Sequence, residues 1–271
     1  MSKGSFLTTD GCRLAFEIEG EGRPVLWQHG LGATTAQPAE VFPTGAGLQR
    51  ITLVCRGHAG SELGDPALLT IEQFTGDVIA LIDHLGIASA AVGGISLGAA
   101  IALRLGALHP DRASALVLAR PAWIDVPGPA TQAAYVEVAR HLRVWGAAEG
   151  RSRFVQTETY RLLLAMAPDN AASMIGFFTR LQPETTIELL SRLPADGPGV
   201  SRRQMTEMPQ PTLVIVTAED HVHPAAYGRE LASLIPRARL AEIIPKAQSR
   251  DCYVAEFRAQ LAGFFVEGND R

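Results

Sequence analysis

The chain has 271 residues, 47% of them hydrophobic and 19% charged, and this composition excludes fibrous and disordered proteins. Its 24 basic and 28 acidic side chains give a net charge of −4, so nucleic acid is not an expected partner. The longest uncharged stretch, residues 85–103, contains four glycines, which argues against a membrane helix. Without a signal-peptide pattern or metal-type cysteine spacing, a cytoplasmic protein without disulfides is expected.

Short apolar segments bounded by turn residues recur along the chain. Residues 6–9 and 13–18 flank Asp10 and Gly11, a dipeptide typical of a two-residue hairpin turn, so an antiparallel pair is expected first. Six further apolar runs follow, at residues 24–29, 51–55, 90–95, 115–119, 212–216 and 240–244. Helical patterns lie between most of these runs. Such alternation predicts a mostly parallel sheet flanked by helices on both faces.

The clearest helix follows residue 70, where Thr70 and Gln73 fit a capping box and apolar residues recur at helical spacing up to Gly86. The stretch from residue 121 to residue 208 has a different pattern, with helical stripes and no convincing strands. We therefore predict an α/β core domain formed by residues 1–120 and 209–271, with a helical cap inserted at residues 121–208. The active site should lie between the cap and the sheet.

The sharpest local motif is GISLG at residues 94–98, which ends an apolar strand and opens a helix at Leu97. Its two glycines allow a tight, strained turn in which the Ser96 hydroxyl stands exposed above the sheet. This context is typical of a catalytic nucleophile, and the Leu97 N–H at the helix start would be an oxyanion donor. The plainer alternative is a glycine-rich turn that only packs the helix on the strand.

Four motifs in chain order resemble those of the α/β-hydrolase superfamily, over nearly the whole chain. They are HGLG at residues 29–32, RGHAGS at 56–61, GISLG at 94–98, and TAED at 217–220 followed by Pro224. The resemblance implies the α/β-hydrolase fold, with Ser96 as nucleophile, Asp220 as acid, and the N–H groups of Leu31 and Leu97 as oxyanion hole. No phosphate-binding glycine loop or metal-type cluster is found, so we expect no cofactor and no metal.

The catalytic histidine of this family is absent from its usual position. It normally follows the last strand, where Ser249 stands here, 29 residues after Asp220, and no histidine occurs after His223. A serine hydroxyl is a weak nucleophile without an adjacent base. The usual triad therefore cannot be assembled from the usual positions.

His223 is the leading candidate for a replacement base, because it lies in the loop that should hold Asp220 near Ser96. Asp220, only three residues earlier, is expected to be poorly placed to orient this imidazole. Asp125, shortly after the strand at residues 115–119, is an alternative orienting carboxylate. The plainer interpretation is that His223 merely shapes the loop.

Arg56, Arg120 and Trp123 are predicted to contact an acidic or aromatic substrate, since arginine pairs bidentately with carboxylates. The alternative is that these arginines hold loops together. His29 is placed with them at the substrate pocket, although in the resembled family this histidine more often supports the oxyanion loop.

The leading functional hypothesis is a cofactor-independent hydrolase that acts on a small ester, lactone or related carbonyl compound. One alternative is a lyase or isomerase that uses only the oxyanion hole, and another is a catalytically inactive ligand-binding protein. A small molecule is the expected partner, with no membrane association, and a homodimer is left open.

Overall fold

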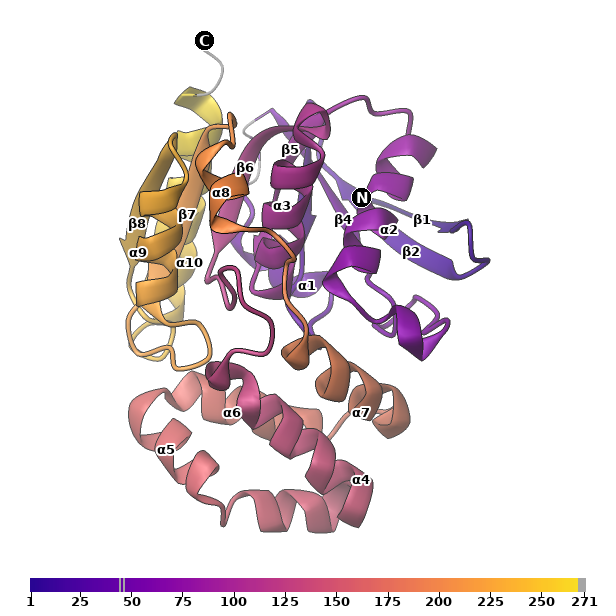
Figure 1. Ribbon diagram of the computed structural model, residues 1–271, viewed down its shortest axis with the longest axis vertical. Helices are drawn as coiled ribbons and strands as arrows, with labels where there is room; N and C mark the ends of the chain where they lie inside the picture. Colours follow the sequence, from indigo (N-terminus) through magenta and orange to yellow (C-terminus); the bar gives the residue numbers. More distant parts are fainter. Residues whose placement is uncertain (44, 46, 268–271) are drawn as a thin grey trace.

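The computed structural model describes residues 1–43, 45 and 47–267, and the eight strands of this part form one central sheet (Figure 1). Their order across the sheet is β1-β2-β4-β3-β5-β6-β7-β8. The strands are β1 (Ser2–Leu7), β2 (Arg13–Glu19), β3 (Arg23–Gln28), β4 (Leu48–Leu53), β5 (Ala90–Ile95), β6 (Ala113–Ala119), β7 (Thr212–Thr217) and β8 (Ala238–Ile243). The first two pairings, β1 with β2 and β2 with β4, are antiparallel, and the others are parallel. The predicted mostly parallel sheet is confirmed.

The first hairpin is also confirmed, but its turn is longer than the predicted two residues. β1 ends at Leu7 and β2 begins at Arg13, so five residues connect them. Gly11 in this turn has φ of 79°, a backbone conformation that only glycine adopts without strain. The turn places Asp10 within reach of the buried guanidinium of Arg56, with which it forms the ion pair described below.

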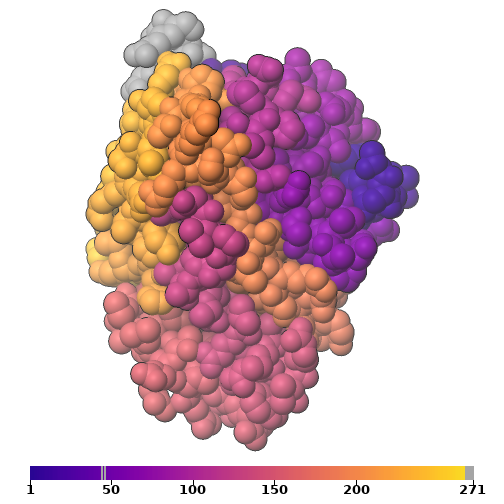
Figure 2. Space-filling model, viewed as in Figure 1, coloured from indigo at the N-terminus to yellow at the C-terminus, as the bar shows by residue number. Residues whose placement is uncertain are grey.

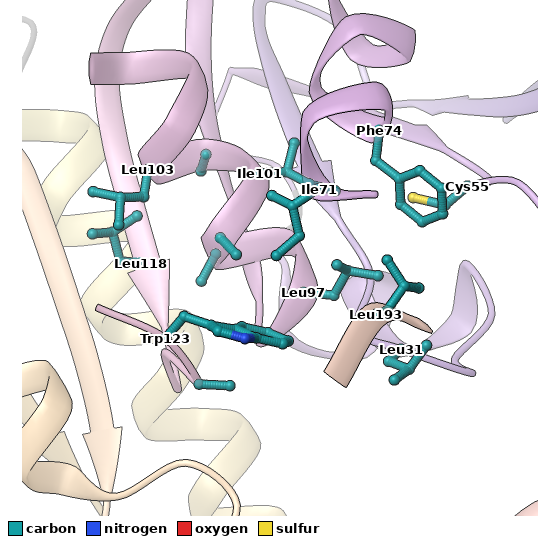
Figure 3. Packing of buried hydrophobic residues seen from close by; sticks show 14 of the residues in the cluster. Leu31, Cys55, Ile71, Phe74, Leu97, Ile101, Leu103, Leu118, Trp123 and Leu193 are labelled. Carbon is teal, nitrogen blue, oxygen red and sulfur yellow. The ribbon is translucent and has the colours of Figure 1, made fainter. Parts of the chain in front are cut away.

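Helices cover both faces of the sheet. On one face, α2, α3 and α9 join a large apolar cluster with strand residues such as Leu118 (Figure 3). On the other face, α1 and α10 form a second cluster that includes Trp27 and Phe257. These helices are α1 (Ala36–Val41), α2 (Ile71–His84), α3 (Leu97–Leu108), α9 (Ala225–Leu234) and α10 (Arg250–Glu267), with short 3-10 turns η1 (Pro66–Leu68) and η2 (Pro110–Arg112). None of the described helices is long and apolar enough to cross a membrane.

The start of α2 shows why only part of the predicted capping box forms. Thr70 accepts the N–H of Gln73 at 3.0 Å, as expected for an N-cap. The side chain of Gln73 donates instead to Asp77 at 2.9 Å. A buried carboxylate one turn later therefore competes successfully for the glutamine amide.

The segment that connects β6 to β7 in the sequence forms a helical layer over the carboxyl ends of the strands. This layer is the lower lobe in Figure 2. It contains α4 (Ala133–Phe154), α5 (Glu158–Met166), α6 (Pro168–Phe177) and α7 (Pro183–Arg192), with η3 (Ala130–Gln132) and η4 (Leu193–Ala195). The last helix before β7, α8 (Arg202–Thr206), packs against α9 of the core. Residues 44, 46 and 268–271, which belong to the predicted α/β core domain, lie outside the described part of the chain.

Candidate active site

Ser96 lies at the sharp turn between β5 and α3. Its backbone has φ of 56° and ψ of −107°, a combination that residues with a side chain rarely adopt and that is found at strained functional sites. Gly94 and Gly98 are required here by space, since a Cβ atom at these positions would lie 2.7 and 2.6 Å from the carbonyl oxygen of Gln28. The turn directs Ser96 into a cavity that is also lined by residues of the inserted helical segment.

The imidazole of His223 lies between Ser96 and Asp220. Its Nε2 is 2.8 Å from the Ser96 Oγ, and its Nδ1 is 2.9 and 3.1 Å from the two carboxylate oxygens of Asp220. When Nδ1 carries the proton and donates a hydrogen bond to the carboxylate, Nε2 is left free to accept the proton of the Ser96 hydroxyl. The three side chains therefore have the relative geometry of a nucleophile, a base and an orienting acid.

The expectation that Asp220 is poorly placed to orient His223 is wrong. The chain turns back on itself between them, so that the N–H of His223 also donates to Asp220 Oδ1 at 3.2 Å. Asp125, the alternative carboxylate, forms an ion pair with Arg202 at 2.9 Å. Acid and imidazole thus share one turn after β7 instead of lying on two separate loops.

Two side chains from the inserted segment hold the backbone of this turn. Asn170 of α6 accepts the N–H groups of His221 and Val222 at 2.8 and 3.1 Å. Its Nδ2 also donates to Asp220 Oδ1 at 3.0 Å. Gln132 of η3 donates to the carbonyl of Val222 at 2.7 Å. Both amides are buried. The sequence did not point to them, because their role depends on a contact with a distant turn and no local motif marks it.

Arg120 balances the charge of Asp220. It follows β6 with φ of 46°, and its guanidinium lies 2.6 Å from the Asp220 carboxylate. Burial opposes ionisation of Asp220, but Arg120 and His223 outweigh this effect, so the pKa of Asp220 is lowered and the carboxylate stays ionised. Tyr253 of α10 lies against the same guanidinium. Arg120 lines the cavity, as expected for a substrate contact, but its charge is already paired.

The electrostatic environment keeps His223 neutral near pH 7. Burial is the largest effect and lowers the pKa of His223, while Asp220 raises it in part and Arg120 lowers it further. The net result is a pKa below the ordinary value of 6.5. A neutral imidazole beside a hydroxyl is able to act as a general base.

The two predicted oxyanion donors belong to elements next to Ser96. Leu97 is the first residue of α3, so its N–H has no acceptor within the helix, and it lies at the positive end of the helix dipole. Leu31 follows β3 and lines the same cavity as Ser96. Two N–H groups at this edge of the sheet are able to stabilise a negatively charged oxygen.

Two buried histidines hold the loop that contains Leu31. Nε2 of His58 accepts the N–H of Gly32 at 2.9 Å, and Nε2 of His29 accepts the N–H of Cys55 at 3.1 Å. Each ring therefore carries its proton on Nδ1, which donates to a backbone carbonyl 2.9 Å away. Burial lowers the pKa of both, that of His58 to about 3. The prediction that His29 contacts substrate is wrong, because its fully buried ring supports the loop instead.

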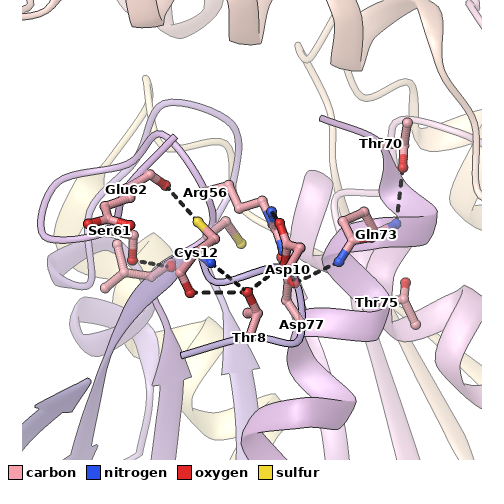
Figure 4. Close-up of polar contacts among 12 residues, drawn as sticks. Thr8, Asp10, Cys12, Arg56, Ser61, Glu62, Thr70, Gln73, Thr75 and Asp77 are labelled. Atoms are coloured by element: carbon pink, nitrogen blue, oxygen red, sulfur yellow. Dashed lines mark hydrogen bonds and ion pairs between the residues drawn. The ribbon is translucent and has the colours of Figure 1, made fainter. Parts of the chain in front are cut away.

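Arg56 also does not reach the cavity. Its side chain is fully buried and forms ion pairs with Asp77 of α2 at 2.7 Å and with Asp10 of the first hairpin turn at 2.6 Å (Figure 4). Each carboxylate accepts a second bond from the guanidinium, at 2.8 Å. The predicted substrate contact is wrong, because the N–H groups of this guanidinium already donate to two aspartates of the protein.

Trp123 is a core residue. Its side chain is 2% exposed and packs in the apolar cluster that contains Leu97 and Leu118 (Figure 3). The predicted contact with substrate is therefore wrong. Ser249, at the position of the missing histidine, caps α10 by accepting the N–H of Cys252 at 3.3 Å and does not line the cavity of Ser96.

The cavity that contains Ser96 and His223 has a volume of about 240 Å³. Residues of the inserted helical segment, among them Phe177 and Arg180, also line it. A second cavity of about 720 Å³ shares these two residues and extends between the loop at residues 57–61 and α7. We refer to the two as the inner and outer chambers.

A larger cavity of about 830 Å³ lies near the opposite ends of the strands, around Ala115, Thr212 and Ala238. Its lining contains no histidine, cysteine or carboxylate, so it offers none of the groups that activate a nucleophile. In the described part of the chain, no group of three histidine, cysteine or acidic side chains could hold a metal ion.

Known proteins share both the sequence pattern and this architecture. A family model of the alpha/beta hydrolase fold matches residues 23–247. The protein RutD of Azorhizobium caulinodans is 23% identical to this chain, over 94% of this chain and 95% of its own length. The 2-hydroxymuconate semialdehyde hydrolase of Pseudomonas putida is 26% identical, over 88% of this chain and 84% of its own length. The crystal structure of an enol-lactonase from Burkholderia xenovorans superposes with a TM-score of 0.72 at 25% identity, covering 94% of this chain and 97% of that one. The predicted fold is confirmed, and the chain belongs to the α/β-hydrolase fold family.

Proposed function

We propose that the protein is a serine hydrolase that cleaves a small ester, lactone or related carbonyl compound through Ser96. The observation that carries the proposal is the 2.8 Å separation between Ser96 Oγ and His223 Nε2, with Asp220 on the other side of the imidazole. A lyase or isomerase that uses only the oxyanion hole, or a ligand-binding protein, needs no base at this hydroxyl, so the arrangement favours hydrolysis over these alternatives. The similarity to a protein of Pseudomonas putida named as a hydrolase and to an enol-lactonase of Burkholderia xenovorans supports an enzyme of this class.

The reaction begins when neutral His223 takes the proton of Ser96 while the Oγ attacks the carbonyl carbon of the substrate. The carbonyl oxygen becomes negatively charged, and the N–H groups of Leu31 and Leu97 donate to it. Protonated His223 then gives its proton to the leaving alkoxide, which leaves an acyl group on Ser96. A water molecule that loses its proton to His223 attacks this ester, and collapse of the second intermediate returns the proton to Ser96 and releases the acid.

A fluorophosphonate probe tests the proposal, because it reacts with a serine hydroxyl that a neighbouring base activates. We expect one probe per chain in the wild-type protein, located at Ser96 by peptide mass mapping, and no labelling of the Ser96→Ala variant. Labelling at a different serine would contradict the proposal. So would an unlabelled wild-type protein under conditions that label a reference serine hydrolase.

Asn170 is expected to position the turn that carries His223. Asn170→Ala leaves the N–H groups of His221 and Val222 without their acceptor and removes a donor to Asp220. A misplaced base lowers the rate of the chemical step by about 10- to 100-fold. The maximal rate of Ser96 labelling should therefore fall by this factor, while the affinity for the probe changes little.

The matched control is Gln156→Ala, which removes an exposed amide of the inserted segment; within the described residues its hydrogen bond is to the carbonyl of Ser152. It should leave the maximal rate of Ser96 labelling and the affinity for the probe unchanged. Melting temperatures of both variants identify the temperature range in which each is folded. An unchanged maximal rate in folded Asn170→Ala protein would show that the turn needs no support from the cap.

A further inference from the structure

The chambers between sheet and cap have an uneven distribution of charge. Their linings contain no aspartate, glutamate or lysine, and two arginines, Arg120 and Arg180. The carboxylate of Asp220 lies 2.6 Å from Arg120, so that cation is already neutralised. Burial lowers the pKa of both His58 and His223, so these rings add no positive charge at neutral pH. One unbalanced cation remains.

This cation, Arg180, lies at the boundary between the two chambers. It follows α6 in the cap, its side chain is exposed, and it lines both chambers. Its guanidinium lies 5.6 Å from the ring centroid of Phe177, which also lines both. Arg140, Arg153 and Arg192 of the inserted segment pair with glutamates, whereas within the described residues no carboxylate partner is found for Arg180.

A guanidinium in this position has unused hydrogen-bonding capacity that faces the space a substrate would occupy. Arginine presents a planar fork of N–H donors that matches a carboxylate, and contact with an aromatic face restricts its orientation. The absence of acidic side chains from both linings leaves a substrate anion without a competitor.

We propose that Arg180 binds a free carboxylate of the substrate, so that the preferred substrates are esters or lactones that carry a second, ionised carboxyl group. This inference rests on the proposed serine hydrolase function. The ester carbonyl would lie at Ser96, the connecting carbon chain against Phe177, and the carboxylate at Arg180. Arg56 and Arg120 were the arginines expected from the sequence to contact an acidic or aromatic substrate. The fold pairs both with aspartates and leaves Arg180 for this role.

The test compares hydrolysis of the monoethyl esters of succinic, glutaric and adipic acid with that of ethyl butanoate, pentanoate and hexanoate. At each length the pair differs only in a terminal carboxylate or methyl group. The wild-type protein should prefer the anionic ester by about tenfold or more in kcat/KM at one length, because an arginine–carboxylate pair is charge-assisted and bidentate. That length reports the span from Ser96 to Arg180.

Three variants assign the preference to one side chain. Arg180→Gln should lose about tenfold or more in kcat/KM for the anionic ester while the neutral ester changes by less than about twofold. Arg180→Lys keeps the charge without the planar fork and should retain part of the preference. Arg161→Gln removes an exposed arginine of α5 that donates to the carbonyl of Gln156, and it should behave as wild type.

The outcomes separate this inference from the proposed function. Cleavage of both ester series without an anionic preference, or with one that persists in Arg180→Gln, overturns the carboxylate site and leaves the hydrolase intact. If Ser96 is not labelled and no ester is cleaved, the hydrolase proposal fails. In that case, calorimetric titration with glutarate tests the carboxylate site at Arg180 independently of catalysis. Binding by wild type and not by Arg180→Gln supports it, and equal or absent binding in both overturns it.

Discussion

Replacing His223 with alanine should lower kcat/KM by about 10⁴-fold or more, a loss as large as that in Ser96→Ala. The imidazole is the one group within hydrogen-bonding distance of the Ser96 hydroxyl among the side-chain contacts of the described residues, at 2.8 Å. Without it, the hydroxyl has no acceptor for its proton at the moment of attack. Residues that act as one unit lose most of their effect when any member is removed, so Ser96→Ala combined with His223→Ala should be little worse than either alone.

The pH profile of the wild-type protein identifies the same group. Protonated His223 cannot accept the Ser96 proton, so kcat/KM falls as the pH drops through the pKa of this imidazole. Because burial, more than any other effect, lowers that pKa, the midpoint of the acid limb should lie below 6.5. Activity should be on a plateau at pH 7.

His109→Ala is the matched control, since His109 is an exposed residue at the end of α3. It should keep wild-type kcat/KM and an unchanged acid limb. Equal rates in His223→Ala and wild type would remove this imidazole from the mechanism. Circular dichroism and melting temperature establish that each variant is folded before rates are compared.

Replacing Arg56 with leucine should lower the free energy of unfolding by about 3–5 kcal/mol. The guanidinium is fully buried and forms four hydrogen bonds to Asp10 and Asp77. Asp77 is itself 1% exposed, so the variant leaves an uncompensated carboxylate in the core. Urea denaturation followed by circular dichroism measures the loss.

Two further variants separate the cost of an unpaired charge from that of a lost ion pair. Arg203→Leu breaks an exposed pair between Arg203 of α8 and Glu207 just after it, where the loss should be below about 0.5 kcal/mol. Combining Arg56→Leu with Asp77→Leu removes both buried charges and should recover part of the stability. A loss in Arg56→Leu no larger than that in Arg203→Leu would show that the buried pairs contribute little. Labelling of Ser96 in folded Arg56→Leu protein should remain, since this arginine lies outside the chamber.

Much of the fold could be read from the amino-acid sequence because the signals are local. Apolar runs of strand length, the glycines around Ser96, and the helical stripes between residues 121 and 208 each depend on neighbours along the chain. The strained turn at Ser96 is local for the same reason, since five consecutive residues define both its conformation and its position between β5 and α3. The order of the four motifs along the chain then identified Leu31 and Leu97 as candidate oxyanion donors and Asp220 as the candidate acid.

Tertiary structure alone decided which polar side chains face the substrate and which serve the fold. Arg56 and His29 are buried among partners brought in by other elements, and Trp123 packs in the core. His223 meets both Ser96 and Asp220 only because the turn after β7 folds back on itself, held by residues of the inserted segment. Burial and charge pairing depend on contacts between residues far apart in the chain, and a one-dimensional pattern contains no record of those contacts.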